Sequence, residues 1–381
     1  MKVAIVLNRV QDTPLMSLLQ KTCPVPSQLV ITSFSAWDEF GWRKPKNLQV
    51  WLDKNDIESV KKNCNNVVVC RSTGEYKSLL SKFDICIACG REFFIFKPIA
   101  KSHIAVSGTR DYFSRLLDII PHYSGALKIV LNGEPWINET DSGTFQMGTR
   151  ENYIQDYNYI NRNLDAFIFA NPLKEYISIL DKSGKKKIRE ELKIPQNEKV
   201  ALVSFRRADS WHTIYKSDKE FYEASLETFR KLKEKGFFVV CRRRMGVDDR
   251  VNRRPRSSEI INFKDFENYI DLELSGWGSY PSEIFKACYA SDLFVMTDTT
   301  LMCHKEAALC GIPTYMPFDL NRDFFQSQVK GWIPAIRDML NCGIIVNKIP
   351  ENDLKSKIKE HNNKWHEGDL QVFWKEALKN N

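Results

Sequence analysis

The sequence has no long uninterrupted apolar run. None of its stretches reaches the roughly 18 consecutive apolar residues that a membrane-spanning helix requires. Its first residues, MKVAIVLNRVQDTP, predict a buried strand followed by a loop and lack the features of a signal peptide. We therefore expect a cytoplasmic protein, whose formal net charge of +8 is compatible with a peripheral place at an anionic membrane surface.

Motifs that would define a cofactor or metal site are also missing. No glycine-rich GxGxxG loop follows the first strand, which disfavours a dinucleotide-dependent oxidoreductase. The pair Asp248-Asp249 sits in a basic loop, so a metal-dependent DxD site is not indicated. Among ten cysteines, Cys86 and Cys89 form a CxxC, but strand alternation separates their faces and no second CxxC follows. We expect reduced thiols, no metal and no bound cofactor.

Apolar strands alternate with amphipathic helical segments along the chain. With 381 residues, 43% of them apolar, the chain exceeds one ordinary core and suits two domains. Such alternation is typical of parallel sheets covered by helices on both faces. The expected fold class is α/β, with two Rossmann-like doubly wound parallel-sheet domains. The expected strands are 2–8, 28–34, 47–53, 66–72, 84–90, 103–108, 126–132, 165–171, 199–205, 237–243, 259–263, 293–298, 312–317 and 343–346.

A polar, Lys-rich stretch at 181–198 interrupts this alternation, and we interpret it as a linker. It separates an N-terminal domain, 1–180, from a C-terminal domain, 199–364. Apolar residues of 365–381 can form one helical stripe, which predicts a C-terminal packing helix.

The most informative segment is 291–317, SDLFVMTDTTLMCHKEAALCGIPTYMP. A buried strand ends near Asp298, a hydroxyl-rich turn follows, and a helix begins. The unpaired N–H groups and positive dipole end at a helix start favour an anion, so Thr299 and Thr300 can present amides and hydroxyls to a phosphate. The alternative is an ordinary capping turn built by Asp298 or Thr299.

Glu306 recurs on the same helical face, about two turns after the proposed phosphate end. A carboxylate at that place can accept hydrogen bonds from both hydroxyls of a ribose. The alternative is a solvated helix residue. His304 lies beside the same segment and is a candidate ligand contact, although a single histidine is more often structural.

This segment resembles the donor-binding strand, helix and strand of GT-B glycosyltransferases, and of the related CDP-glycerol phosphotransferases and UDP-N-acetylglucosamine 2-epimerases. The resemblance implies two domains facing across a cleft and a nucleotide-sugar site in the C-terminal one. The chain departs from several capsule and phosphotransferase families in lacking a His-Pro pair where Cys241–Arg244 stands. The matching residues are Asp298, Thr299, Thr300, Glu306, Ala307, Gly311, Ile312 and Pro313.

Arginines follow two strands of the C-terminal domain. Arg206 and Arg207 come directly after 199–205, and Arg243 stands at the end of 237–243. Because ligands bind outside the carboxyl ends of parallel strands, these side chains can offer bidentate donors to a diphosphate without a metal. The alternative is a solvated, basic loop.

A catalytic base is expected from the N-terminal domain, where the resemblance implies a carboxylate or histidine that removes the acceptor proton. Candidates on loops after strands are Asp12, Glu92, Asp111 and Glu134, with Asp12 first by position. Each can equally be a cap or a surface residue.

These features favour a metal-independent glycosyltransferase that uses a nucleotide-sugar donor and a hydroxyl acceptor: a glycan, a lipid-linked molecule or a nucleic acid. One alternative is a CDP-polyol phosphotransferase or nucleotide-sugar epimerase. Another is a non-enzymatic nucleotide- or nucleic-acid-binding protein, suggested by the arginine-rich segment 242–256. No obligate protein partner is indicated.

Overall fold

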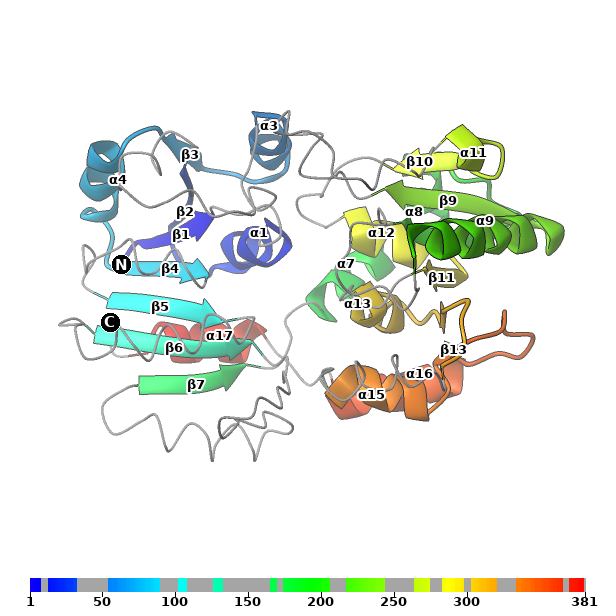
Figure 1. Ribbon diagram of the computed structural model, residues 1–381. Coiled ribbons are helices and arrows are strands. Elements are labelled where there is room, and N and C mark those ends of the chain that lie inside the picture. Colours follow the sequence, from blue (N-terminus) through cyan, green and yellow to red (C-terminus); the bar gives the residue numbers. More distant parts are fainter. Residues whose placement is uncertain are drawn as a thin grey trace. The chain divides into compact units, whose positions relative to one another are not determined.

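The computed structural model describes residues 1–7, 13–32, 54–89, 102–107, 126–132, 165–169, 174–205, 217–243, 264–274, 283–297, 303–320, 334–365 and 370–379. These residues form two compact units (Figure 1). Unit 1 contains the chain up to Glu175 and the last helix, and unit 2 contains the described residues from Tyr176 to Trp365. Among the described helices, none has the length and apolar character needed to cross a bilayer.

Unit 1 is built on a parallel sheet, which has seven strands in the described residues. Their order is β3-β2-β1-β4-β5-β6-β7, so the chain starts at the centre, runs to one edge and then returns to complete the other. The β1 residues are all buried, as expected of a central strand covered on both faces. The strands are β1 (Val3–Leu7), β2 (Ser27–Thr32), β3 (Val67–Cys70), β4 (Ile85–Cys89), β5 (Ser102–Ser107), β6 (Ala126–Asn132) and β7 (Asp165–Phe169).

Helices of unit 1 include one from the far end of the sequence. The described helices are α1 (Thr13–Thr22), α3 (Lys54–Asn63), α4 (Thr73–Leu80) and α17 (Leu370–Ala377). Phe373 and Trp374 of α17 are buried, and the indole Nε1–H of Trp374 donates to Thr22 Oγ1 of α1 over 3.1 Å. Residues 370–377 therefore pack with unit 1.

Unit 2 repeats the same plan with six strands in its described part. The order is β10-β9-β8-β11-β12-β13, and all pairs are parallel. The strands are β8 (Lys199–Phe205), β9 (Phe237–Arg243), β10 (Leu272–Leu274), β11 (Leu293–Met296), β12 (Thr314–Tyr315) and β13 (Ile345–Val346). The two doubly wound, Rossmann-like parallel sheets confirm the fold class predicted from the alternation.

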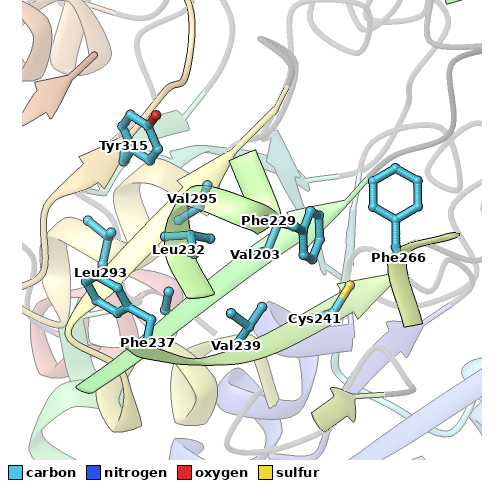
Figure 2. Packing of buried hydrophobic residues seen from close by; sticks show 11 residues of the cluster. Val203, Phe229, Leu232, Phe237, Val239, Cys241, Phe266, Leu293, Val295 and Tyr315 are labelled. Atoms are coloured by element: carbon cyan, nitrogen blue, oxygen red, sulfur yellow. The ribbon is translucent and has the colours of Figure 1, made fainter. Parts of the chain in front are cut away.

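The two faces of the unit 2 sheet are covered by different helices. On one face, Phe229 and Leu232 of α9 (Asp218–Glu234) and Phe266 of α11 (Lys264–Glu267) pack onto alternate strand residues such as Val239 and Cys241 (Figure 2). Phe229 and Phe266 meet edge to face, with ring centroids 5.3 Å apart.

The other face is covered by α12 (Glu283–Ala290) and α13 (Cys303–Leu309). Cys288 of α12 is fully buried, and His304 of α13 lies edge-on to Phe294 of β11. Helices α15 (Pro334–Asn341) and α16 (Lys355–Trp365) follow, and α16 contacts α13.

The segment interpreted as a linker, 181–198, is instead part of unit 2. Helix α7 (Lys174–Ser183) runs into α8 (Lys185–Glu191), and Ile188 and Arg189 of α8 are buried. All three nitrogens of the Arg189 guanidinium donate hydrogen bonds. Nε donates to Ala290 O, Nη1 to the carbonyls of 195, 196 and 198, and Nη2 to Asp292. The Lys-rich composition suggested a solvated linker because only a few residues of the segment, among them Ile188 and Arg189, are buried.

Candidate functional site

The order of strands in unit 2 reverses between β8 and β11, which are hydrogen-bonded neighbours. Met296 pairs with Ser204 at the carboxyl ends of the two strands. In open parallel sheets, ligands bind outside the carboxyl ends of the strands at such a switch point. Arg206 and Arg207 follow β8, and Asp298, Thr299 and Thr300 follow β11; all five lie outside the described residues. The strand ends that lead to these two predicted groups are nevertheless adjacent.

Strand β9 brings a third group to the same edge. It pairs with β8 so that Arg242 stands opposite Ser204, and Arg243 stands opposite Phe205. The predicted Arg243 thus occupies the last position of a strand next to the switch point, although its side chain is outside the described atoms. Arg242, which sequence reasoning left within a general basic run, is half-buried.

Thr297, directly after β11, is a further polar residue at this edge. Its side chain is fully buried, and its Oγ1 forms no hydrogen bond within the part of the chain that the structure describes. A buried hydroxyl without a partner costs about 1–3 kcal/mol. The sequence analysis did not single out Thr297 as a candidate, although its place at a strand end before Asp298 was a usable signal.

Helix α13 carries two of the predicted residues. His304 is 1% exposed, and burial lowers its pKa to about 3, so its imidazole is neutral at physiological pH. Its place against Phe294 gives it a packing role within the core. Glu306 is half-buried on the same helix.

The pKa of the Cys288 thiol is affected by three neighbouring residues, Cys310, Glu306 and Arg242. Burial raises its pKa first, a hydrogen bond with Cys310 and the negative charges of Cys310 and Glu306 raise it further, and the positive charge of Arg242 opposes them. Charged residues of β9 and α13 therefore both influence this thiol of α12.

The Gly-Ile-Pro that follows α13 ends the helix and leads into β12. Gly311 has φ +76°, a left-handed conformation that glycine adopts without strain. Its N–H donates to Ala308 O over 2.9 Å, and the N–H of Ile312 donates to Ala307 O over 3.1 Å. Asn362 of α16 also donates to Ala308 O, over 2.7 Å, so the end of α13 is held from outside.

Unit 1 has its own switch point, between β1 and β4, where Val6 pairs with Ala88. Asp12 and Glu92 follow these two strands in the sequence, whereas Asp111 follows β5, one strand further out. All three candidate bases, and Glu134, lie outside the described residues. The topology still distinguishes the candidates, because Asp12 and Glu92 follow the two strands at the switch point and Asp111 does not.

A pocket of about 940 Å³ opens at the opposite edge of the unit 2 sheet, near the amino ends of β8, β11 and β12. Its wall includes Arg189, Asp292 and Lys185, which are bonded to one another or to backbone. Hydrogen bonds from Lys185 and Val200 N–H outweigh the effect of burial and lower the pKa of Asp292. These charges hold α8 against the sheet, and the pocket is also lined by Gly311, Ile312 and Pro313, which follow α13. In the described residues, no cluster of three or more His, Cys, Asp or Glu side chains could hold a metal ion.

Comparison with known proteins gave matches among solved structures. No protein-family model matches the sequence, and no curated protein matches it. A histidine-to-asparagine variant of the wall teichoic acid polymerase TagF, soaked with CDPG, has 12% identity and a TM-score of 0.57; the match covers 99% of this chain and 88% of TagF. The unsoaked polymerase TagF matches with 10% identity and a TM-score of 0.52, over 100% of this chain and 88% of that one.

The Methanocaldococcus jannaschii UDP-GlcNAc 2-epimerase, solved with UDP-GlcNAc and UDP, aligns with 13% identity over 97% of this chain and 94% of that one, with a TM-score of 0.47. At these identities, similarity establishes the fold alone. The chain therefore has a GT-B-like fold, with two Rossmann-like units in one polypeptide.

Proposed function

We propose that this protein is a nucleotide-sugar-dependent glycosyltransferase whose unit 2 binds the donor. The observation that carries the proposal is the meeting of three strand ends at the unit 2 switch point. There β8 leads to Arg206 and Arg207, β9 ends at Arg243, and β11 leads to Thr297 and the hydroxyl-rich turn. Rossmann-like sheets bind ligands at such a switch point, and arginines and hydroxyl groups that follow its strands are suitable donors for an anion.

Each residue then has a chemical role. Arg206, Arg207 and Arg243 neutralise the diphosphate, whose charge grows as the bond to the sugar breaks, and so stabilise the leaving group without a metal ion. Asp298, Thr299 and Thr300, which precede α13 in the sequence, supply hydroxyl and amide donors to a phosphate oxygen. Glu306 accepts from the ribose hydroxyls, and His304 holds α13 against β11.

The acceptor hydroxyl loses its proton to a carboxylate of unit 1 as its oxygen attacks the anomeric carbon. Asp12 and Glu92 are the favoured bases because they follow the strands at the unit 1 switch point. Asp111 is third. A glycan, lipid-linked or nucleic-acid acceptor remains consistent with the charge of +8.

A screen of ligand-induced stabilisation tests the donor class. UDP-, GDP-, CMP-, CDP- and TDP-linked sugars are added singly, and a bound nucleotide raises the melting temperature by mass action. We expect one nucleotide family to stabilise the protein. Arg206→Ala and Arg243→Ala should weaken that binding, whereas Arg230→Ala, an exposed arginine paired with Glu227 on α9, should not. No shift with any nucleotide would overturn the proposal.

The second candidate is a CDP-polyol phosphotransferase, favoured by the full-length match to TagF. The products distinguish the two for a diphosphate-linked donor, because a glycosyltransferase releases the nucleoside diphosphate, whereas transfer of a polyol phosphate from a CDP-polyol releases CMP. Turnover of the donor without any acceptor would instead indicate an epimerase. Salt-sensitive DNA binding without nucleotide turnover would favour the non-enzymatic alternative.

A further inference from the structure

Helices α12 and α13 bring two cysteines together. The two helices contact one another (Figure 1). Cys288 lies on α12, and Cys310 directly follows α13. The thiol of Cys310 donates to the backbone carbonyl of Phe285 on α12, with Sγ 3.6 Å from the oxygen. In a helix, the side chains three and four positions after a carbonyl lie beside it. Cys310 therefore reaches α12 at the place where Cys288 stands.

The two thiols also interact with each other. A hydrogen bond joins the side chain of Cys288 to that of Cys310, and both cysteines are free. Cys288 is fully buried, and burial raises the pKa of its thiol well above the ordinary value, so this thiol keeps its proton. Two reduced thiols in such a contact need only a two-electron oxidant to become a disulfide.

The thiols of this pair differ in how an oxidant can reach them. Cys310 is half-buried and lines the pocket of about 940 Å³, next to Gly311 and close to Tyr289. Cys288 does not line the pocket and is 0% exposed. A small oxidant that enters the pocket therefore meets Cys310 first. The same exposure leaves Cys310 open to overoxidation to a sulfinic acid, which thiols do not reverse.

We propose that Cys288 protects Cys310 from a peroxide by closing a reversible disulfide between α12 and the end of α13. The sulfur of Cys310 attacks one peroxide oxygen, the O–O bond breaks, and the other oxygen leaves as water. The sulfur of Cys288 then attacks the sulfur of the resulting sulfenic acid. The S–O bond breaks, and the hydroxyl leaves as water with the proton of the Cys288 thiol. In total the thiols lose two electrons and two protons, and hydrogen peroxide is reduced to water.

The contact between the thiols favours the second step over further oxidation. Because Cys288 is already in place, its attack replaces an encounter of Cys310 with a second peroxide molecule. Transfer of its proton to the departing hydroxyl also avoids a free thiolate in apolar surroundings. This inference does not depend on the proposed function.

The test maps the oxidised bond. Reduced protein is treated with hydrogen peroxide, the excess is removed with catalase, the remaining thiols are alkylated in denaturant, and the peptides are identified by mass spectrometry. Trypsin leaves Cys288 and Cys303 on one peptide, 287–305, so a second digestion with chymotrypsin, which cleaves after Tyr289 and Phe294, is needed to separate them. We expect a peptide that links Cys288 to Cys310 and that disappears on reduction with dithiothreitol.

Variants assign the two roles. In Cys288→Ala, the sulfenic acid of Cys310 should persist long enough to be trapped with dimedone, and sulfinic acid at Cys310 should accumulate several-fold more than in the wild type. In Cys310→Ala, Cys288 should stay reduced, because it does not line the pocket. Cys342→Ser is the matched control: it removes an exposed thiol and should leave the link between Cys288 and Cys310 unchanged.

Three results would overturn the proposal: absence of the linked peptide from the oxidised wild type, a link from Cys310 to Cys303 in its place, or equal sulfinic acid in the wild type and Cys288→Ala. If Cys288→Ala does not fold, the wild type decides alone. Recovery of the Cys310 thiol with dithiothreitol then supports the pair, and sulfinic acid without a linked peptide contradicts it. Nucleotide binding is not a readout, so failure here leaves the proposed function untouched.

Discussion

Arg189 donates from Nη2 to Oδ2 of Asp292 over 3.0 Å, and the same carboxylate oxygen accepts the backbone N–H of Val200 over 2.9 Å. The contact ties α8 to the starts of β8 and β11. These two strands flank the switch point, and their opposite ends lead to the proposed donor residues. A structural ion pair at one edge of the sheet therefore holds the strands that build the site at the other edge.

Replacing Asp292 by asparagine should lower the free energy of unfolding by about 1–2 kcal/mol at pH 7, because Arg189 is buried and loses its counter-ion. The estimate is modest because the Asp292 side chain is 35% exposed. Urea denaturation measures the change. Glu191→Gln, which removes an exposed ion pair with Lys286, is the control and should cost no more than about 0.5 kcal/mol.

The stabilities of wild type and Asp292→Asn should respond differently to acid. The pKa of Asp292 is lowered in the folded protein, so its contribution is complete above the ordinary aspartate pKa of about 3.9 and is lost as the pH falls through the lower folded value. The difference in stability between wild type and Asp292→Asn should therefore shrink below about pH 4. A difference that persists unchanged at pH 3 would contradict the role of the ionised carboxylate.

His304 should make the protein less stable in mild acid. Its pKa falls from 6.5 to about 3 on burial, so between these values the unfolded chain binds a proton that the folded chain does not. Stability should fall as the pH decreases from 6.5 toward 3. In His304→Gln this contribution is absent, and the decrease in melting temperature between pH 7.5 and pH 5 should be smaller. Parallel curves for the two proteins would refute the assignment.

Two glycine substitutions should have opposite effects. Gly311→Ala should destabilise the protein by roughly 1–2 kcal/mol, because φ is +76° and strain is the sole penalty where the added Cβ meets no atom within 4 Å. Gly74→Ala in α4 should stabilise it by about 0.5–1 kcal/mol, since its nearest neighbour, Ser72 Oγ, is 3.9 Å away. Thermal unfolding gives both signs. Unchanged or increased stability in Gly311→Ala would argue against the helix-ending role of Gly311, and a loss of stability in Gly74→Ala would contradict the expectation for α4.

Thr22→Val should loosen α17, because the buried indole N–H of Trp374 loses its acceptor at a cost of about 1–3 kcal/mol. Thr22→Ser keeps the hydroxyl and serves as the control. Limited proteolysis should remove the C-terminal segment faster from Thr22→Val than from wild type or Thr22→Ser. Equal cleavage rates in all three would show that the hydrogen bond does not hold α17.

The sequence predicted much of this fold because buried strands carry continuous apolar runs. KVALVSF and FFVVCRR coincide with β8 and β9 as the structure has them. Strand β10, LEL, was not predicted, because a three-residue edge strand with Glu273 exposed has no apolar run. The expected strands 47–53 and 259–263 lie outside the described residues.

The sequence predicted which strand ends lead to the candidate site, but not how the side chains there are arranged. Strand ends and the register between them follow from the fold, so the place of the arginines after β8 and β9 could be anticipated. Which of two adjacent arginines shares a face with Glu306 depends on strand phase and on the helices above each face. The sequence left open whether His304 contacts a ligand or is structural, because its packing against Phe294 of β11, ten positions earlier, depends on the fold.

The chain completes unit 1 with α17, after it has built unit 2. During translation, the surface of α1 that receives Trp374 must wait until residues 370–377 have left the ribosome. Unit 2, whose described residues end at Trp365, has no such delay at its carboxyl end. The part of the protein that is synthesised first is thus the part whose packing is finished last.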